Sequence, residues 1–186
     1  MSVDSVLADI EDRMTKAVSV TKEDFSGVRT GRAAPALVER LRVDYYGADT
    51  ALQQLASISV PDHRTLLVNV YDQNAVSSVE KAIRNSDLGL NPSTDGSTVR
   101  LTFPPLSAER RKEMVKLVKA KAEEHRVSVR NLRHRAKKDL EHLQGEGEIS
   151  EDDLHRSEKR LQDLTNKYVG EIDELLRHKE HELLED

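Results

Sequence analysis

The sequence predicts an α+β protein in which a long three-helix bundle is interrupted by a small inserted β/α/β domain. Apolar residues recur at helical spacing in three long stretches, residues 3–28, 107–143 and 150 to near the C-terminus. Residues 36–104 change to alternating and β-branched patterns. The 186-residue chain is only 37% hydrophobic and 34% charged, which suits thin, helix-rich architecture better than a thick globular core.

The first helix is predicted from residue 3 to about residue 28, where an apolar stripe runs from Val3 to Val28. Gly31 and Pro35 are expected to end it, because both residues disfavour a helix interior. The next segment has a different period, so this helix has no partner beside it in the sequence. It must therefore pack against helices that come later in the chain.

The inserted segment is predicted to contain short strands and one short helix. The turn-rich stretch at residues 88–96 contains Gly, Pro, Ser and Asp, and it is expected to connect that helix to the last strand. The expected strands lie at residues 57–60, 66–71 and 99–103, with strand-like composition also at 37–47, and the helix lies at 74–85.

The second and third helices are predicted to form an antiparallel pair. Ser107 is expected to cap the second helix, which runs to about Leu143 and would be about 55 Å long at ~1.5 Å per residue. Ser150 followed by Asp153 resembles a capping box for the third helix. A short Gly-containing loop joins the two helices, so they should lie side by side in opposite directions.

These elements place the helical bundle in residues 1–30 and 106–186 and the inserted α/β domain in residues 31–105. The chain passes between the two parts twice, through segments rich in Gly and Pro. Such segments permit a limited reorientation of the parts, and we therefore predict a hinge there. The hinge residues are Thr30, Gly31, Arg32, Pro104 and Pro105.

A basic stripe on an otherwise acidic chain indicates a function. Between Ser107 and Gln144 there are twelve Lys/Arg against six Asp/Glu, a net of +6 in a chain whose overall net charge is −5. The cations follow helical steps, and no acid occurs from Arg126 to Lys138. This pattern predicts a cationic helix face that binds a nucleic acid, although charge runs are more often solvated faces with i,i+4 ion pairs. The stripe consists of Lys112, Lys116, Lys119, Arg126, Arg130, Arg133 and Lys137.

Two further basic pairs are candidate anion contacts. Arg110 and Arg111 lie at the start of the second helix, where the helix dipole disfavours cations, so a bound anion would account for them. Arg29 and Arg32 lie at the expected hinge, where the alternative is that they complement the C-terminal dipole of the first helix.

Several classes of function are excluded or disfavoured. The chain has no Cys, which excludes disulfides, thiolate catalysis and Cys-ligated zinc. His178 and His181, with Glu182 beside them, lie on one helical turn, but no third ligand at typical spacing is evident, so we predict no metal site. No catalytic constellation or nucleotide-binding loop is present, so we predict no enzyme and no cofactor. No apolar run approaches ~20 residues and the N-terminus lacks a basic leader, so a cytoplasmic protein is expected.

Four long segments of the chain resemble the ribosome recycling factor family, and the similarity extends from end to end. This resemblance implies a three-helix bundle with an inserted domain on a hinge, in an L shape of about tRNA size. It also implies a monomeric translation factor that binds large-subunit ribosomal RNA and, with the GTPase elongation factor G, splits the post-termination ribosome. The segments are VRTGRAAPALVERLRVDYYG (28–47), LQQLASISVPDHRTLLVNVYD (52–72), VEKAIRNSDLGLNPSTDGSTVRLTFPPLSAERRKEMVK (79–116) and VSVRNLRHRAKKDL (127–140).

The resemblance also implies which residues contact ribosomal RNA. This chain departs from the family at one position: it has His134 after Arg133, where many relatives have a second Arg, and Arg135 supplies a cation one position later on a different face. Hydrolysis of GTP would belong to the partner and not to this chain. The implied contact residues are Arg130, Asn131 and Arg133, with Arg110 and Arg111, and Arg29, Gly31 and Arg32 near the hinge.

Two other functional classes compete with this interpretation. A helical scaffold that binds only proteins would show salt-insensitive binding and an exposed apolar patch. An RNA-modifying enzyme or nuclease would need an acid, base or metal set, and the sequence contains none that we recognise.

Overall fold

The computed structural model describes residues 1–185, and the chain divides into two compact units. One unit contains the segment up to Thr30 together with the segment from Ala108 onward, and the other contains Gly31–Ser107. The predicted α+β fold class, with a long helical part and a small sheet-containing part, is confirmed.

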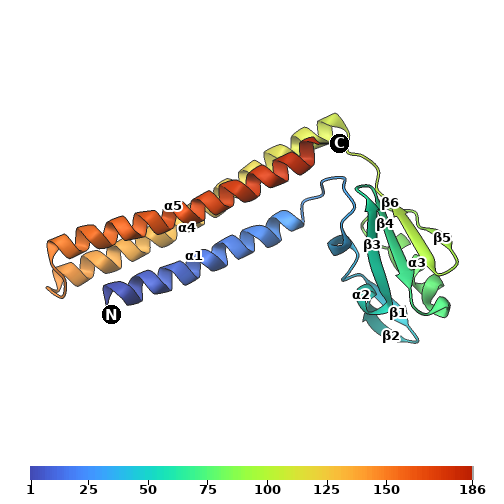
Figure 1. The fold of residues 1–186 in the computed structure, drawn as a ribbon, viewed down its shortest axis with the longest axis horizontal. Coiled ribbons are helices and arrows are strands. Elements are labelled where there is room, and N and C mark those ends of the chain that lie inside the picture. Colours follow the sequence, from blue (N-terminus) through green and yellow to red (C-terminus); the bar gives the residue numbers. More distant parts are fainter. Residues whose placement is uncertain (186) are drawn as a thin grey trace. The chain divides into compact units, whose positions relative to one another are not determined.

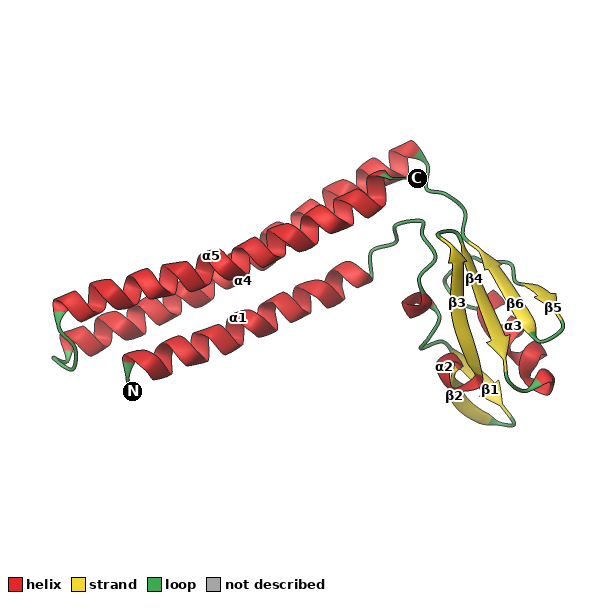
Figure 2. Ribbon diagram, viewed as in Figure 1, coloured by secondary structure: helices red, strands yellow, loops and turns green. Residues whose placement is uncertain are grey.

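The helical unit consists of α1 (Val3–Ser26), α4 (Ala108–Gly145) and α5 (Glu151–Leu184), and each helix contacts the other two (Figure 1). Helix α4 has 38 residues and α5 has 34. The two are joined by the short segment 146–150 and run antiparallel (Figure 2). This is the antiparallel pairing that a short loop between two long amphipathic helices favours.

The ends of the helices follow local capping chemistry. The predicted capping box of α5 is confirmed: the Ser150 hydroxyl accepts from Asp153 N at 3.1 Å, and the Asp153 carboxylate accepts from Ser150 N at 3.3 Å. These bonds hold the pKa of Asp153 below its usual value. Helix α1 ends at Ser26, two residues before the predicted end at about residue 28, and Gly27 follows it as the C-cap, ahead of the expected Gly31 and Pro35.

The core of the helical unit is a narrow apolar stripe along each helix. Small residues fill part of it, since Ala122 and Ala136 of α4 are fully or almost fully buried. Three buried hydroxyls donate to the backbone carbonyl four residues earlier in their own helices, so their polar atoms are satisfied. Those hydroxyls belong to Thr21, Ser157 and Thr165, and the large buried side chains include Leu7, Met14, Phe25, Val118, Leu140, Leu161, Tyr168 and Ile172.

The α/β unit is built on a four-stranded antiparallel sheet in the order β3-β4-β6-β5. A separate two-stranded hairpin, β1–β2, precedes it, and the helix α3 packs against β1 and β6 (Figure 1). The strands are β1 (Arg42–Tyr45), β2 (Ala48–Ala51), β3 (Ala56–Asp62), β4 (Thr65–Val70), β5 (Ser93–Asp95) and β6 (Thr98–Thr102). The helices are α2 (Leu52–Leu55) and α3 (Val76–Arg84), with 3-10 turns at Pro35–Leu37 and Gln73–Ala75.

The predicted strands at 57–60, 66–71 and 99–103 correspond to β3, β4 and β6, and the predicted helix at 74–85 contains α3. Three short elements were missed. The elements β2 and α2 have only four residues each, and β5, with three residues, lies within the stretch interpreted as turn. Elements this short carry too few residues to establish a period.

Candidate nucleic-acid interface

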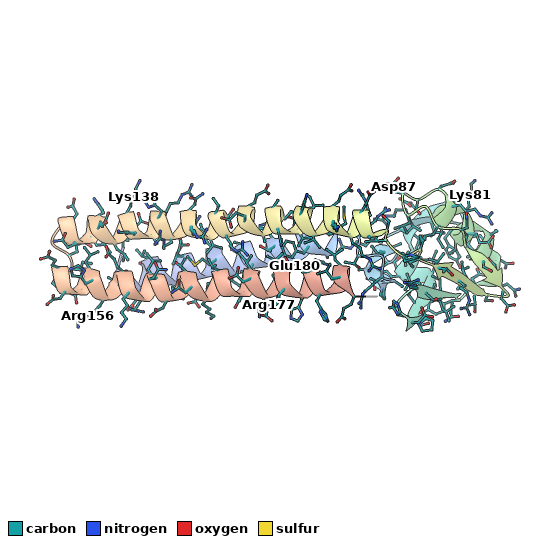
Figure 3. The ribbon with its side chains drawn as sticks, turned by 90° about the horizontal axis from the view of Figure 1, so that it is seen from above. Lys81, Asp87, Lys138, Arg156, Arg177 and Glu180 are labelled. Carbon is teal, nitrogen blue, oxygen red and sulfur yellow. The ribbon has the colours of Figure 1, made fainter. Side chains whose placement is uncertain are left out.

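Helix α4 has one side in the bundle core and the other side in solvent. Figure 3 shows Lys138 projecting from α4 away from α5. The exposed cations on this side continue along most of the helix, as the sequence predicts for an amphipathic helix with a basic face. We call this surface the cationic face; it consists of Lys112, Lys116, Lys119, Arg130, Lys137 and Lys138.

Much of the charge on the cationic face is not neutralised. Within the described part of the chain, Lys112, Lys116 and Lys138 have no carboxylate within 4.0 Å. Lys119 lies 3.9 Å from Glu180, and Lys137 lies 3.9 Å from Glu141, distances too long for direct hydrogen bonds. Exposed pairs of this kind contribute little stability and leave the cations available to an external anion.

Arg130 lies at the centre of the cationic face and shares a carboxylate with a neighbour. Its Nη1 is 3.3 Å from Glu123, and the Arg130 side chain is 50% exposed. The same Glu123 carboxylate also accepts from Arg126 at 3.0 Å. Arg130 therefore has only a share of one carboxylate, and half of its side chain remains open to an external anion.

The expectation that Arg126 turns outward with the rest of the stripe is wrong. Its side chain is only 18% exposed, and its Nε donates to Asp173 of α5 at 2.7 Å. Burial would lower the pKa of Arg126, but its hydrogen bonds to Asp173 and Glu123 outweigh that effect and raise it. Arg126 is therefore part of the contact between α4 and α5, with two carboxylates as partners.

Arg133 is half-buried and also contacts α5, but its partner is neutral. Its Nη1 donates to Gln162 Oε1 at 3.0 Å. Its Nε is buried with no hydrogen-bond partner in residues 1–185. The adjacent Asn131, His134 and Arg135 are exposed. The positive charge of Arg133 is therefore not neutralised by this contact, and it lies at the border between the cationic face and α5.

Arg110 and Arg111 lie in the first turn of α4, where the sequence places them. Arg110 is exposed and pairs with Glu113 at 2.8 Å, and Arg111 is half-buried. The Glu113 carboxylate therefore neutralises part of the positive charge for which the sequence analysis had invoked a bound anion.

The predicted hinge residues are divided between the two units. Thr30 is the last residue of the first segment of the helical unit, and Gly31 is the first residue of the α/β unit. Gly31 has a φ of 77°, and an added Cβ would lie 3.0 Å from Leu106 Cγ. Both the left-handed backbone and this close approach require glycine. Arg29 is exposed, Arg32 is half-buried, and Pro104 and Pro105 are exposed.

The opposite edge of α4 contains an ionic cluster that the sequence analysis missed. Asp24 of α1 lies 2.8 Å from Lys121 Nζ and 2.8 Å from His125 Nε2. The bonds from Lys121 and His125 hold the pKa of Asp24 below its usual value, although partial burial opposes them. This cluster fixes α1 against α4, and it removes Lys121 from the cations available to a ligand.

Two histidines of α5 form ion pairs along that helix. His178 pairs with Glu174 at 3.6 Å and His181 with Glu185 at 2.9 Å, both along one exposed helix. Nowhere in residues 1–185 do three metal-binding side chains converge. Among the helices of those residues, none is long and apolar enough to span a membrane.

Together the fold and the cationic face define a class of protein: a helical bundle with one basic helix face, interrupted by an α/β unit. Residues 21–184 match the family model described as ribosome recycling factor. This match covers most of the chain and both units. The chain therefore belongs to the ribosome recycling factor family.

Individual relatives resemble the chain over almost its whole length. A ribosome-recycling factor of Thermobifida fusca is 55% identical, and one of Thermomicrobium roseum is 54% identical; each alignment covers 98% of this chain and 99% of the relative. A solution structure of a ribosome recycling factor has 46% identity and a TM-score of 0.79, covering 99% of this chain and 98% of that one. A second structure, with 44% identity, a TM-score of 0.70 and full coverage of both chains, is the Thermus thermophilus factor, described with Escherichia coli elongation factor G bound to the post-termination complex.

Proposed function

We propose that this chain is a translation factor that recycles ribosomes after termination. In this proposal it binds the large subunit and, together with elongation factor G, splits the post-termination complex. The observation that carries the proposal is the cationic face of α4, in a chain that belongs to the ribosome recycling factor family along nearly its whole length. A row of exposed cations on a rigid helix suits the regularly spaced phosphates of folded RNA.

The proposed RNA contacts are the residues that the family resemblance implies, together with Lys137 of the cationic face. Arg126 is left out, because its charge is already matched by Asp173 and Glu123. Asn131 can donate and accept hydrogen bonds beside the cations, which a phosphate or ribose requires. The proposed set is Arg29, Gly31, Arg32, Arg110, Arg111, Arg130, Asn131, Arg133 and Lys137.

We further propose that the two units move relative to each other during this reaction. The segments around Thr30, Gly31 and Arg32 and around Pro104 and Pro105 are the proposed hinge. Two chain crossings permit rotation but limit its range. Elongation factor G would then act on the α/β unit while the cationic face holds the bundle on RNA. The GTP hydrolysis that drives the motion would belong to that partner, and the chain would act as a monomer in the cytoplasm without a cofactor.

The binding test is an affinity measurement with purified large ribosomal subunits. Arg133→Ala should weaken binding about tenfold or more at moderate salt, because a charge-assisted contact to phosphate is lost. Wild-type affinity should fall steeply with salt, and the variant's salt dependence should be shallower by about one phosphate contact. Helicity should remain as in the wild type.

Arg177→Ala is the matched control for this substitution. Arg177 is exposed on α5, where it pairs with Glu174, and it projects away from α4 (Figure 3). Its removal takes away the same charge but should change affinity by less than about twofold. Equal affinities of Arg133→Ala and wild type would contradict the proposed interface. Salt-independent binding would instead favour the alternative of a protein-binding scaffold.

Recycling activity is tested separately by light scattering on post-termination ribosomes with and without elongation factor G. Splitting should require the chain, the GTPase and GTP together. If the chain binds large subunits but causes no loss of scattered light in that mixture, the recycling proposal is wrong and only RNA binding remains.

A further inference from the structure

Arg126 and Arg133 lie on the edge of α4 that faces α5, and their partners on α5 differ in charge. Arg126 donates to the Asp173 carboxylate at 2.7 Å, whereas Arg133 donates to the neutral Gln162 amide at 3.0 Å. The two contacts have nearly the same length and link the same two helices. The difference between them is therefore mainly one of charge.

A carboxylate partner neutralises the charge of an arginine and so weakens its attraction for other anions. If Arg126 contacted a phosphate, the Asp173 and Glu123 carboxylates that already match its charge would lie close to the incoming anion and repel it. A neutral amide carries no such penalty, because it fixes the guanidinium without cancelling its charge. Arg133 can therefore bind a phosphate while it keeps its contact with Gln162.

The Gln162 side chain is itself held in the required orientation. Its Nε2 donates to Asn166 Oδ1 at 2.8 Å, which turns Oε1 toward Arg133. The orientation is chemically determined, because a guanidinium has only donors and must face an acceptor. Asn166, Gln162 and Arg133 thus form a chain of hydrogen bonds that begins on α5 and ends at the border of the cationic face.

We propose that Gln162 is a positioning residue that holds the Arg133 guanidinium at the RNA-facing border of α4 while leaving its positive charge available. The Nε edge of Arg133 is buried, so the guanidinium is held on one side by the protein and can present its remaining donors on the other. This inference rests on the proposed function, since it assumes that Arg133 contacts ribosomal RNA.

The test measures the affinity of the full chain for purified large ribosomal subunits over a series of salt concentrations. Gln162→Glu turns the neutral contact into an ion pair and should weaken binding about tenfold, with a salt dependence shallower by about one contact. Gln162→Ala leaves the net charge unchanged but releases the guanidinium, and it should weaken binding about threefold. Melting curves should show that both variants are folded.

The same two substitutions in an Arg133→Ala background decide whether Gln162 acts through Arg133. There each should change affinity by less than about twofold, because the positioned group is gone. Ser19→Glu, at an exposed position on α1, adds the same charge as Gln162→Glu and should also have less than about a twofold effect.

The outcomes separate this inference from the proposed function. If Arg133→Ala weakens binding but the Gln162 variants bind like wild type, Gln162 has no positioning role and the proposed interface stands. If the Gln162 variants weaken binding equally with and without Arg133, they act by general repulsion or altered packing, and the inference is overturned. If Arg133→Ala itself has no effect, both the proposed interface and this inference are wrong.

Discussion

The helical unit and the α/β unit bury their apolar side chains in different ways. In the α/β unit sixteen buried residues form one cluster that draws on the sheet, α2, α3 and the connecting segments. In the helical unit the core is a stripe along three helices, and its margins contain hydrogen-bonded charges such as Asp24, Arg126 and Asp173. In the cluster the elements share one core, whereas in the stripe each turn packs mainly against the nearest turns of the other two helices.

This difference suits the two roles proposed for the units. A long stripe provides an extended surface on which charges can be set at regular intervals, and α4 uses it for the cationic face. A compact cluster keeps a small unit intact as a rigid body, which is what a partner that moves it requires. The comparison also predicts different responses of the two units to substitution.

The largest expected effect is that of truncating a central side chain of the α/β cluster. Leu66 in β4 is fully buried, and Leu66→Ala should lower the free energy of unfolding of residues 31–107 by about 3–5 kcal/mol, through lost burial and the cavity left behind. Native-state hydrogen exchange should show the loss throughout β3, β4 and β6, because these strands share one core. The amides in the middle of α4 should keep their protection.

Leu161→Ala in α5 is the matched change in the helical unit, since Leu161 is 2% exposed. It should raise exchange most in the turns of the three helices nearest to it and should leave the sheet unchanged. If either substitution lowers protection equally in both units, the units do not unfold independently and the contrast between cluster and stripe fails.

The second prediction concerns the ionic margin of the stripe. Asp24→Asn removes the carboxylate that accepts from Lys121 and His125, and it should cost about 1–2 kcal/mol of stability at neutral pH. Asp12→Asn, which breaks the exposed pair with Lys16, should cost less than about 0.5 kcal/mol. Denaturant unfolding of the two variants and the wild type measures the difference.

The same substitution has a defined pH dependence. The folded-state pKa of Asp24 is lowered from 3.8 by its bonds to Lys121 and His125. A lowered pKa contributes stability that is present above the unfolded value and is lost as pH falls through the folded value. The advantage of wild type over Asp24→Asn should therefore be full above about pH 5 and should shrink in more acidic solution. An advantage that grew below about pH 5 would show that Asp24 is not the responsible group.

The sequence was sufficient for the parts of the molecule that depend on local periodicity. The three long helices, the central strands, α3 and the Ser150–Asp153 capping box all follow from residue spacing or capping chemistry within a few residues. The short elements β2, α2 and β5 could not be predicted, because their existence depends on pairing with a neighbouring strand or on the surrounding core and not on their own pattern.

The candidate site was predicted in outline but not in its details. Spacing placed Arg126 and Arg133 on the same side of α4, yet only the register of α4 against α5 determines that one meets Asp173 and the other Gln162. Counting back equal distances from the loop at 146–150 could have suggested both contacts. Whether a side chain turns toward its partner or toward solvent is decided by the packing of three helices, which a single sequence does not specify.

The smallest expected effect comes from glycine, and it should have opposite signs in the two units. Gly170 is a solvent-exposed residue in the middle of α5, and nothing lies within 4 Å of an added Cβ. Gly170→Ala should therefore stabilise the helical unit by about 0.5–1 kcal/mol. Gly96 lies between β5 and β6 with equally open surroundings but a φ of 60°. Gly96→Ala should destabilise the α/β unit by about 1 kcal/mol, because alanine is strained in the left-handed region. Since neither methyl group meets a neighbour, thermal unfolding of the two variants measures only the backbone contribution to the change in stability. At Gly170 that contribution is helix propensity, whereas at Gly96 it is the strain of the left-handed turn. Two shifts of the same sign would show that the two units do not differ in this respect.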